Sequence, residues 1–136
     1  MSLKILDSNY EDLCIEVFVK NKRLLFYTLY RPPNSDINFN SYFSDIYSDI
    51  DISFYDFICV LGDFNFNFMP KNNRLTKEAN VLKEVLLSYG LKQIIEIPTF
   101  PSADPKSILD LVFINSINLI NKLQVIPIIF HYFPFM

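Results

Sequence analysis

The sequence lacks the excess of basic residues that a protein needs to hold DNA by phosphate neutralisation alone. It has 12 lysines and arginines against 15 aspartates and glutamates, for a formal net charge of −3. This balance excludes a strongly cationic nucleic-acid-binding chain, so any contact with nucleic acid must be local or mediated by a metal ion. A small basic cluster follows the central motif described below and is equally compatible with a solvated loop and helix start; it comprises Lys71, Arg74 and Lys77.

The sequence also has only two cysteines, no apolar segment typical of a signal peptide and no long uninterrupted apolar run. Cys14 and Cys59 lie inside apolar runs and lack the spacing of a metal site, so we expect buried free thiols of an intracellular protein. Residues 1–12 contain no apolar signal segment, and polar residues and prolines interrupt the longest apolar stretch, residues 123–136. We therefore expect a nuclear or cytoplasmic protein that is neither secreted nor inserted in a membrane.

The chain is rich in apolar and aromatic residues. Its 136 residues are 51% hydrophobic and 16% aromatic, which is typical of a globular chain with a substantial core. The sequence contains no internal repeat and no low-complexity linker. We therefore predict a single domain, which we assign to residues 8–135.

The spacing of apolar residues predicts a mixed α/β chain. Residues 13–20 alternate between two faces, residues 20–23 form a polar turn, and residues 24–30 are apolar on both faces, which predicts an antiparallel hairpin over residues 13–30. Apolar residues at helical spacing predict amphipathic helices over residues 39–50 and 76–90. Further strands are predicted over residues 57–61, 109–114 and 123–135, and residues 91–97 are predicted to form a short strand or an extended connector.

Residues 57–65 (FICVLGDFN) are the stretch around which the chain is organised. Five apolar residues run into a glycine, an aspartate and an asparagine, which predicts a buried strand with polar groups at its C-terminal end. In an extended chain Asp63 and Asn65 project to the same side, so both could face one phosphate or one metal-bound water. The alternative is a polar turn that only follows a core strand.

Asp110 is a second polar residue in an unusual place, near the start of the apolar run 109–114. A carboxylate in such a run is costly to bury unless it is paired or hydrogen-bonded. We therefore expect either a functional acid or an aspartate that faces water at a strand edge.

Four short motifs occur in an order that resembles the endonuclease/exonuclease/phosphatase superfamily: residues 29–34 (LYRPPN), 62–65 (GDFN), 98–99 (PT) and 107–113 (SILDLVF). The chain is most similar to the apurinic-type endonuclease domain at the front of non-LTR retrotransposon reverse transcriptase polyproteins. This resemblance extends over nearly the whole chain. It implies an α/β (α+β) fold that forms part of a four-layer α/β/β/α sandwich of the deoxyribonuclease type.

The resemblance also implies roles for five residues. Asp63 would orient or deprotonate the attacking water, Asn65 would hydrogen-bond the scissile phosphate, and Tyr30 would lie near the phosphate or leaving group. Asp110 would position a catalytic histidine, and His131, the chain's one histidine, lies at the expected place. The implied substrate is DNA and the implied ion is Mg²⁺, which prefers oxygen ligands, here Asp63 and Asn65.

The sequence departs from the family pattern near both ends. Ile129 and Phe130 stand where the family has a serine and an aspartate before its histidine. Only 29 residues precede Tyr30, and neither glutamate among them has the context of the family's metal ligand. We therefore expect a truncated domain with a weak, incomplete metal site and little or no catalysis. The alternative role for His131 is a structural one.

Three functions are compatible with these patterns. The first is a remnant of a Mg²⁺-dependent phosphodiesterase, the DNA endonuclease domain of a retrotransposon-derived reverse transcriptase. The second is a non-catalytic module that binds nucleic acid or protein. The third is a phosphatase of the same fold. Loss of partner strands would also leave an open sheet edge through which the chain could associate with itself.

Overall fold

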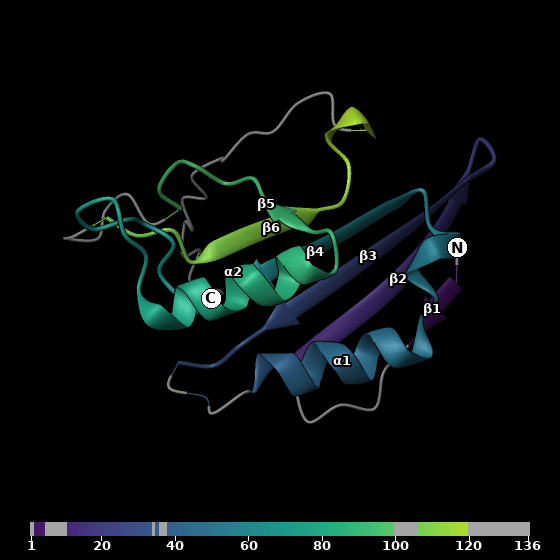
Figure 1. Ribbon diagram of the computed structural model, residues 1–136. Coiled ribbons are helices and arrows are strands. Elements are labelled where there is room, and N and C mark those ends of the chain that lie inside the picture. Colours follow the sequence, from purple (N-terminus) through teal and green to yellow (C-terminus); the bar gives the residue numbers. More distant parts are fainter. Residues whose placement is uncertain (1, 5–10, 34, 36–37, 100–105, 120–136) are drawn as a thin grey trace, which may run out of the picture.

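The computed structural model describes residues 2–4, 11–33, 35, 38–99 and 106–119, and these form one six-stranded sheet flanked by helices (Figure 1). The strand order is β1-β2-β3-β4-β6-β5. Only β3 and β4 run parallel, and every other neighbouring pair is antiparallel. The strands are β1 (Ser2–Lys4), β2 (Glu11–Val19), β3 (Lys22–Tyr30), β4 (Phe57–Asp63), β5 (Lys92–Gln93) and β6 (Asp110–Ile114).

Helices α1 (Phe39–Asp49) and α2 (Lys77–Ser88) cover the same face of this sheet (Figure 1). Helix α1 belongs to the crossover from β3 to β4, since two parallel strands cannot be joined by a tight turn. Each helix begins at a side-chain cap: Asn38 accepts a hydrogen bond from Ser41 N–H, and Thr76 accepts one from Ala79 N–H. Two short 3₁₀ helices, η1 (Ile52–Phe54) and η2 (Ile117–Leu119), follow α1 and β6. Neither α1 nor α2 is long and apolar enough to cross a membrane, and no other described segment forms such a helix.

The main core lies between the two helices and the sheet. Its fully buried members come from both helices and from neighbouring strands: Phe43, Val60, Leu82, Leu86 and Phe113. Burial of each such side chain stabilises the fold by about 1.5–3 kcal/mol. Alternate residues of the same strands form a smaller cluster on the other face, composed of Phe57, Cys59 and Ile114. This two-sided burial explains why residues 57–61 form an uninterrupted apolar run.

The structure confirms the predicted hairpin, both predicted helices and the predicted strands that contain Asp63 and Asp110. The predicted α+β class is also confirmed. Strand β5 is shorter than the segment predicted over residues 91–97. The side chain of Gln93 bonds both backbone groups of Ile95, which ends the ladder there. Strand β1 was not predicted. The predicted strand 123–135 lies outside the described residues, as do both ends of the predicted domain.

Candidate functional site

Three of the predicted site residues lie side by side at one end of the sheet. Asp63, the last residue of β4, is the register partner of Tyr30 at the end of β3 and of Asp110 at the start of β6. Directly opposite residues of paired strands point to the same face, with Cβ atoms about 4.5–5.5 Å apart in antiparallel pairs. The fold therefore brings together one phenol and two carboxylates from three separate segments.

The close approach of β4 to β3 depends on Gly62. Its φ of +152° lies in a region that L side chains rarely adopt. A Cβ atom at this position would lie 1.9 Å from the carbonyl oxygen of Leu29, which is shorter than any tolerable contact. The glycine is thus required for the register that places Asp63 beside Tyr30.

Asp63 and Asn65 are joined by a tight turn. The Asp63 carboxylate accepts a hydrogen bond from the Asn65 N–H at 3.0 Å, and Asn65 has a φ of +50°. The prediction that both side chains project from an extended chain is therefore wrong, because the chain turns at Asn65. The Asn65 Nδ2 donates to the carbonyl oxygen of Arg31 at 2.6 Å, which holds the segment after β3 against this turn. A contact between Asn65 and phosphate stays a prediction.

The Arg31 side chain is buried beneath the same turn. Its guanidinium lies 4.0 Å from the centre of the Phe66 ring and donates to the carbonyl oxygens of Phe64 and Ser35, at 3.4 and 2.7 Å. The Arg31 N–H also donates to the Asp63 carbonyl oxygen at 2.9 Å. Arg31 therefore links the ends of β3 and β4, a role that its place in the LYRPPN motif did not reveal.

Two polar side chains with no individually predicted role fix the start of β6. The Thr99 Oγ1 accepts hydrogen bonds from the N–H groups of Leu109 and Asp110, at 3.1 and 3.3 Å. The Asn67 Oδ1 accepts one from the Ile108 N–H at 3.1 Å. Together they hold Asp110 in register with Asp63. The proline-threonine motif was the only sequence signal for Thr99, and Asn67 gave none beyond its place in a polar loop.

The environment of Asp63 favours its protonated form. Partial burial raises the pKa of this carboxyl, the hydrogen bond from Asn65 N–H lowers it, and the charge of Asp110 raises it again. Within the described part of the chain, no lysine or arginine forms a salt bridge with either acid. The pair can therefore share a proton or a cation, and a raised pKa makes Asp63 a stronger proton acceptor than an ordinary aspartate.

The donor set suits Mg²⁺ in kind but is small in number. Asp63 and Asp110 offer carboxylate oxygens, which Mg²⁺ prefers to nitrogen or sulfur. The described residues contain no group of three or more His, Cys, Asp or Glu side chains that could hold a metal ion. Two carboxylates can hold a hydrated Mg²⁺ firmly only when substrate phosphates complete its shell. His131 lies outside the described residues.

Solved structures of similar fold include two nuclease-related proteins. The endonuclease domain of TRAS1, a telomere-specific non-LTR retrotransposon, matches with a TM-score of 0.58 and 15% identity over 75% of this chain and 49% of that domain. An endonuclease/exonuclease/phosphatase family protein from Leptotrichia buccalis C-1013-b matches with a TM-score of 0.50 and 17% identity, over 77% of this chain and 42% of that one.

This chain thus spans about half the length of either structure. Scans of the sequence against protein-family models and against curated proteins gave no match. The fold of the described residues is nevertheless similar to that of these two solved structures.

Proposed function

We propose that the chain is part of a Mg²⁺-dependent phosphodiesterase, the DNA endonuclease domain of a retrotransposon-derived reverse transcriptase. The observation that carries this proposal is the register of Asp63 with Asp110 at the C-terminal end of β4. The likeness to the TRAS1 endonuclease domain supports DNA as the substrate. Fold alone does not define a reaction, so the proposal depends on this pair of acids.

In this proposal Asp63 accepts the proton of the attacking water. A general base is most effective when its pKa lies near the working pH, and burial and the Asp110 charge both move the pKa of Asp63 in that direction. Tyr30 is exposed on the other side of Asp63, where its hydroxyl can donate to a phosphate or leaving-group oxygen. Mg²⁺ bound beside Asp63 would neutralise charge on the phosphate.

We expect the 136 residues alone to hydrolyse DNA poorly. The described residues supply two adjacent carboxylates and no third Asp, Glu, His or Cys side chain that completes a metal site with them. The chain also spans about half the length of the solved endonuclease domain. Incubation of the chain with supercoiled plasmid and Mg²⁺ tests this expectation. Robust nicking that disappears in Asp63→Ala would show that the site is complete within this chain.

A chimera tests the phosphodiesterase assignment itself. The matching part of the TRAS1 endonuclease domain would be replaced by this chain, and nicking would be compared with that of the same chimera carrying Asp63→Ala. We expect nicking that falls at least about 100-fold in the variant, the range expected for loss of a general base. A chimera that unfolds cooperatively but does not nick would contradict the assignment.

The small number of metal ligands favours a second candidate, a module that binds nucleic acid without cleaving it. Such a module would bind DNA equally well in Mg²⁺ and in EDTA. Its affinity would not fall in Asp63→Ala. A chimera that binds but never nicks would favour this function over the first.

A further inference from the structure

A tight turn after β4 places two cations side by side. Lys71 and Arg74 form an isolated antiparallel bridge, in which each N–H donates to the other residue's carbonyl oxygen, at 2.9 and 3.0 Å. Asn72 and Asn73 between them have φ angles of +51° and +60°, the positive values that a type I′ turn requires. The backbone of the turn therefore has a defined conformation.

This arrangement is electrostatically unfavourable in the free protein. Residues directly opposite each other in an antiparallel pair project to the same side, and like charges in such positions destabilise the pair. Lys71 and Arg74 are both exposed, and neither takes part in a salt bridge with another described residue. Lys22 and Arg23, by contrast, each contact a carboxylate. A bound anion would relieve the repulsion at the turn.

The turn lies at the same end of the sheet as the two acids. It belongs to the connection between β4 and α2, which lies at the left of Figure 1, where β4 ends and β6 begins. This connection is fixed to the start of β6, because Phe68 N–H donates to the Ile108 carbonyl oxygen at 2.9 Å and Asn67 accepts from the Ile108 N–H. The turn therefore belongs to a connection that is held at the end of the sheet where the candidate site lies.

We propose that Lys71 and Arg74 contact the phosphate backbone of a nucleic acid beside the phosphate at Asp63 and Asp110. This inference rests on the proposed function and adds to it the residues that hold the DNA at phosphates beyond the scissile bond, which a small phosphorylated molecule lacks. With a net charge of −3, the chain has no general basic surface for DNA, so binding must depend on a local contact of this kind or on a metal ion. Arginine binds phosphate through two parallel hydrogen bonds, and lysine acts as a point charge beside it.

Salt-dependent DNA binding tests the inference without any cleavage. The affinity of a fluorescein-labelled 20-base-pair duplex would be measured in EDTA at several salt concentrations, for the wild type and for Lys71→Ala/Arg74→Ala. Each phosphate contact contributes about 0.9 to the slope of log affinity against log salt, so the double variant should lower that slope by about 2. A labelled single strand of the same sequence would show whether the duplex is required.

Lys83→Ala/Lys92→Ala is the charge-matched control. Both lysines are exposed, Lys83 lies on α2, and Lys92 pairs with Ile114 at the end of β6 away from Asp110. We expect this control to keep the wild-type slope, and we expect neither variant to unfold at a lower temperature than the wild type. Three outcomes would overturn the inference. These are an equal loss of slope in both variants, an unchanged slope in Lys71→Ala/Arg74→Ala, and no measurable binding of DNA by the wild type. The assay needs neither metal nor cleavage, so its failure is distinct from a failure of the chimera to nick.

Discussion

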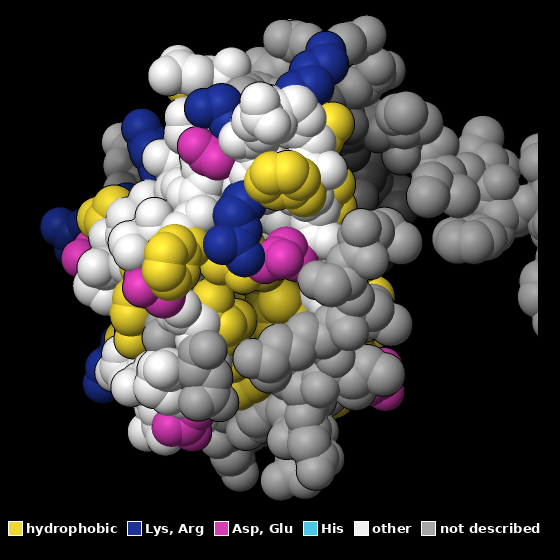
Figure 2. Space-filling model, turned by 90° about the vertical axis from the view of Figure 1, so that its right-hand side faces the viewer, with side chains coloured by type: hydrophobic (Ala, Val, Ile, Leu, Met, Phe, Trp, Pro, Cys, Tyr) yellow, Lys and Arg dark blue, Asp and Glu magenta, His cyan; other side chains and the backbone are white. Residues whose placement is uncertain are grey.

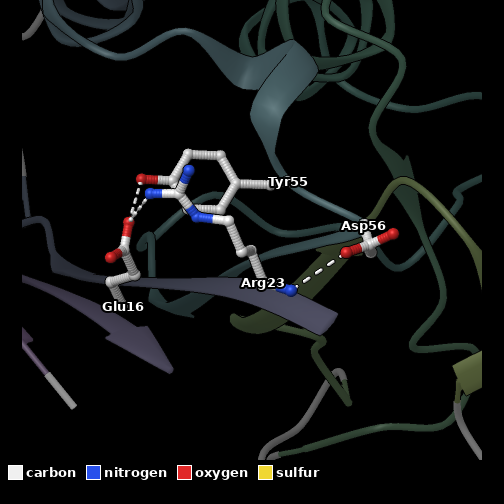
Figure 3. A network of polar contacts seen from close by, with 4 residues as sticks. All are labelled: Glu16, Arg23, Tyr55 and Asp56. Carbon is white, nitrogen blue, oxygen red and sulfur yellow. Dashed lines mark hydrogen bonds and ion pairs between the residues drawn. The ribbon is translucent and has the colours of Figure 1, made fainter. Parts of the chain in front are cut away.

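The two ends of the sheet differ in how their charged side chains are arranged. At the end that carries the β2–β3 turn, opposite charges are paired. Arg23 lies 3.1 Å from Glu16 (Figure 3), and Lys22 lies 3.3 Å from Asp56. Asp56 also accepts a hydrogen bond from the Arg23 N–H, and Tyr55 donates to Glu16. Figure 2, which views the molecule from this end, shows basic and acidic side chains interspersed among hydrophobic ones.

At the other end, like charges lie together. Asp63 is opposite Asp110, and Lys71 is opposite Arg74. Paired charges need no ligand, whereas each like-charged pair has a cost that a bound ion of the opposite sign would remove. The comparison supports the proposal that the functional site lies at the second end.

Replacement of Gly62 should have the largest effect on stability, because any side chain at this position would collide with the backbone of β3. In Gly62→Ala the new Cβ would collide with the Leu29 carbonyl oxygen. We expect the free energy of unfolding to fall by about 3 kcal/mol or more in urea denaturation. Gly90→Ala is the control: its φ is +76° but its Cβ would meet no atom within 4 Å, so a loss of about 1 kcal/mol is expected. Equal losses in the two variants would refute the packing argument.

Removal of the Thr99 hydroxyl should have the next largest effect. Thr99→Val keeps the shape but leaves the Leu109 and Asp110 N–H groups without their acceptor. We expect unfolding to become easier by about 1–3 kcal/mol. Thr99→Ser keeps the hydroxyl and should lose clearly less stability than Thr99→Val. If both variants are equally stable, the hydroxyl does not fix the start of β6.

At the paired end, Tyr55→Phe should lower the free energy of unfolding by about 0.5–1.5 kcal/mol at neutral pH, because it removes the 2.7 Å hydrogen bond to Glu16. Burial and the bond to Glu16 raise the pKa of Tyr55 to about 12. The folded state therefore holds this proton more tightly than the unfolded chain, and the stabilisation is lost as the pH rises from 10 to 12. Unfolding curves at pH 7 and pH 11 should show a smaller difference between wild type and variant at pH 11. A difference independent of pH would contradict this role.

Much of the fold could be predicted because its elements follow local patterns. The uninterrupted apolar run before Asp63 and the alternation in the hairpin both reflect burial on known faces of a strand. The register of Asp63 with Asp110 was foreseeable only through the family motifs, since no local pattern pairs two strands so far apart in the chain. The catalytic role of His131 stays a prediction.

The remaining features depend on partners that are distant in the sequence. The turn at Asn65 follows from a bond to the Arg31 carbonyl, and the register of Asp110 depends on Thr99. Asp12, in β2, accepts hydrogen bonds from the hydroxyls of Tyr27 and Tyr42, at 2.5 and 2.7 Å, beneath α1. Such bonds leave no periodic trace in the sequence, so the spacing of residue types does not reveal them.

The smallest effect, a shift in one carboxyl titration, gives the most direct test of the common site. The pKa of the Asp63 carboxyl would be measured by carbon-13 NMR in the wild type and in Asp110→Asn. We predict that Asp63 titrates above 3.8 in the wild type, and that its pKa falls when the neighbouring charge is removed. Protonation of Asp63 therefore favours the folded state, and the wild type should lose stability relative to Asp63→Asn as the pH rises above 3.8. An Asp63 pKa that is the same in the wild type and in Asp110→Asn would show that the two acids do not share a site.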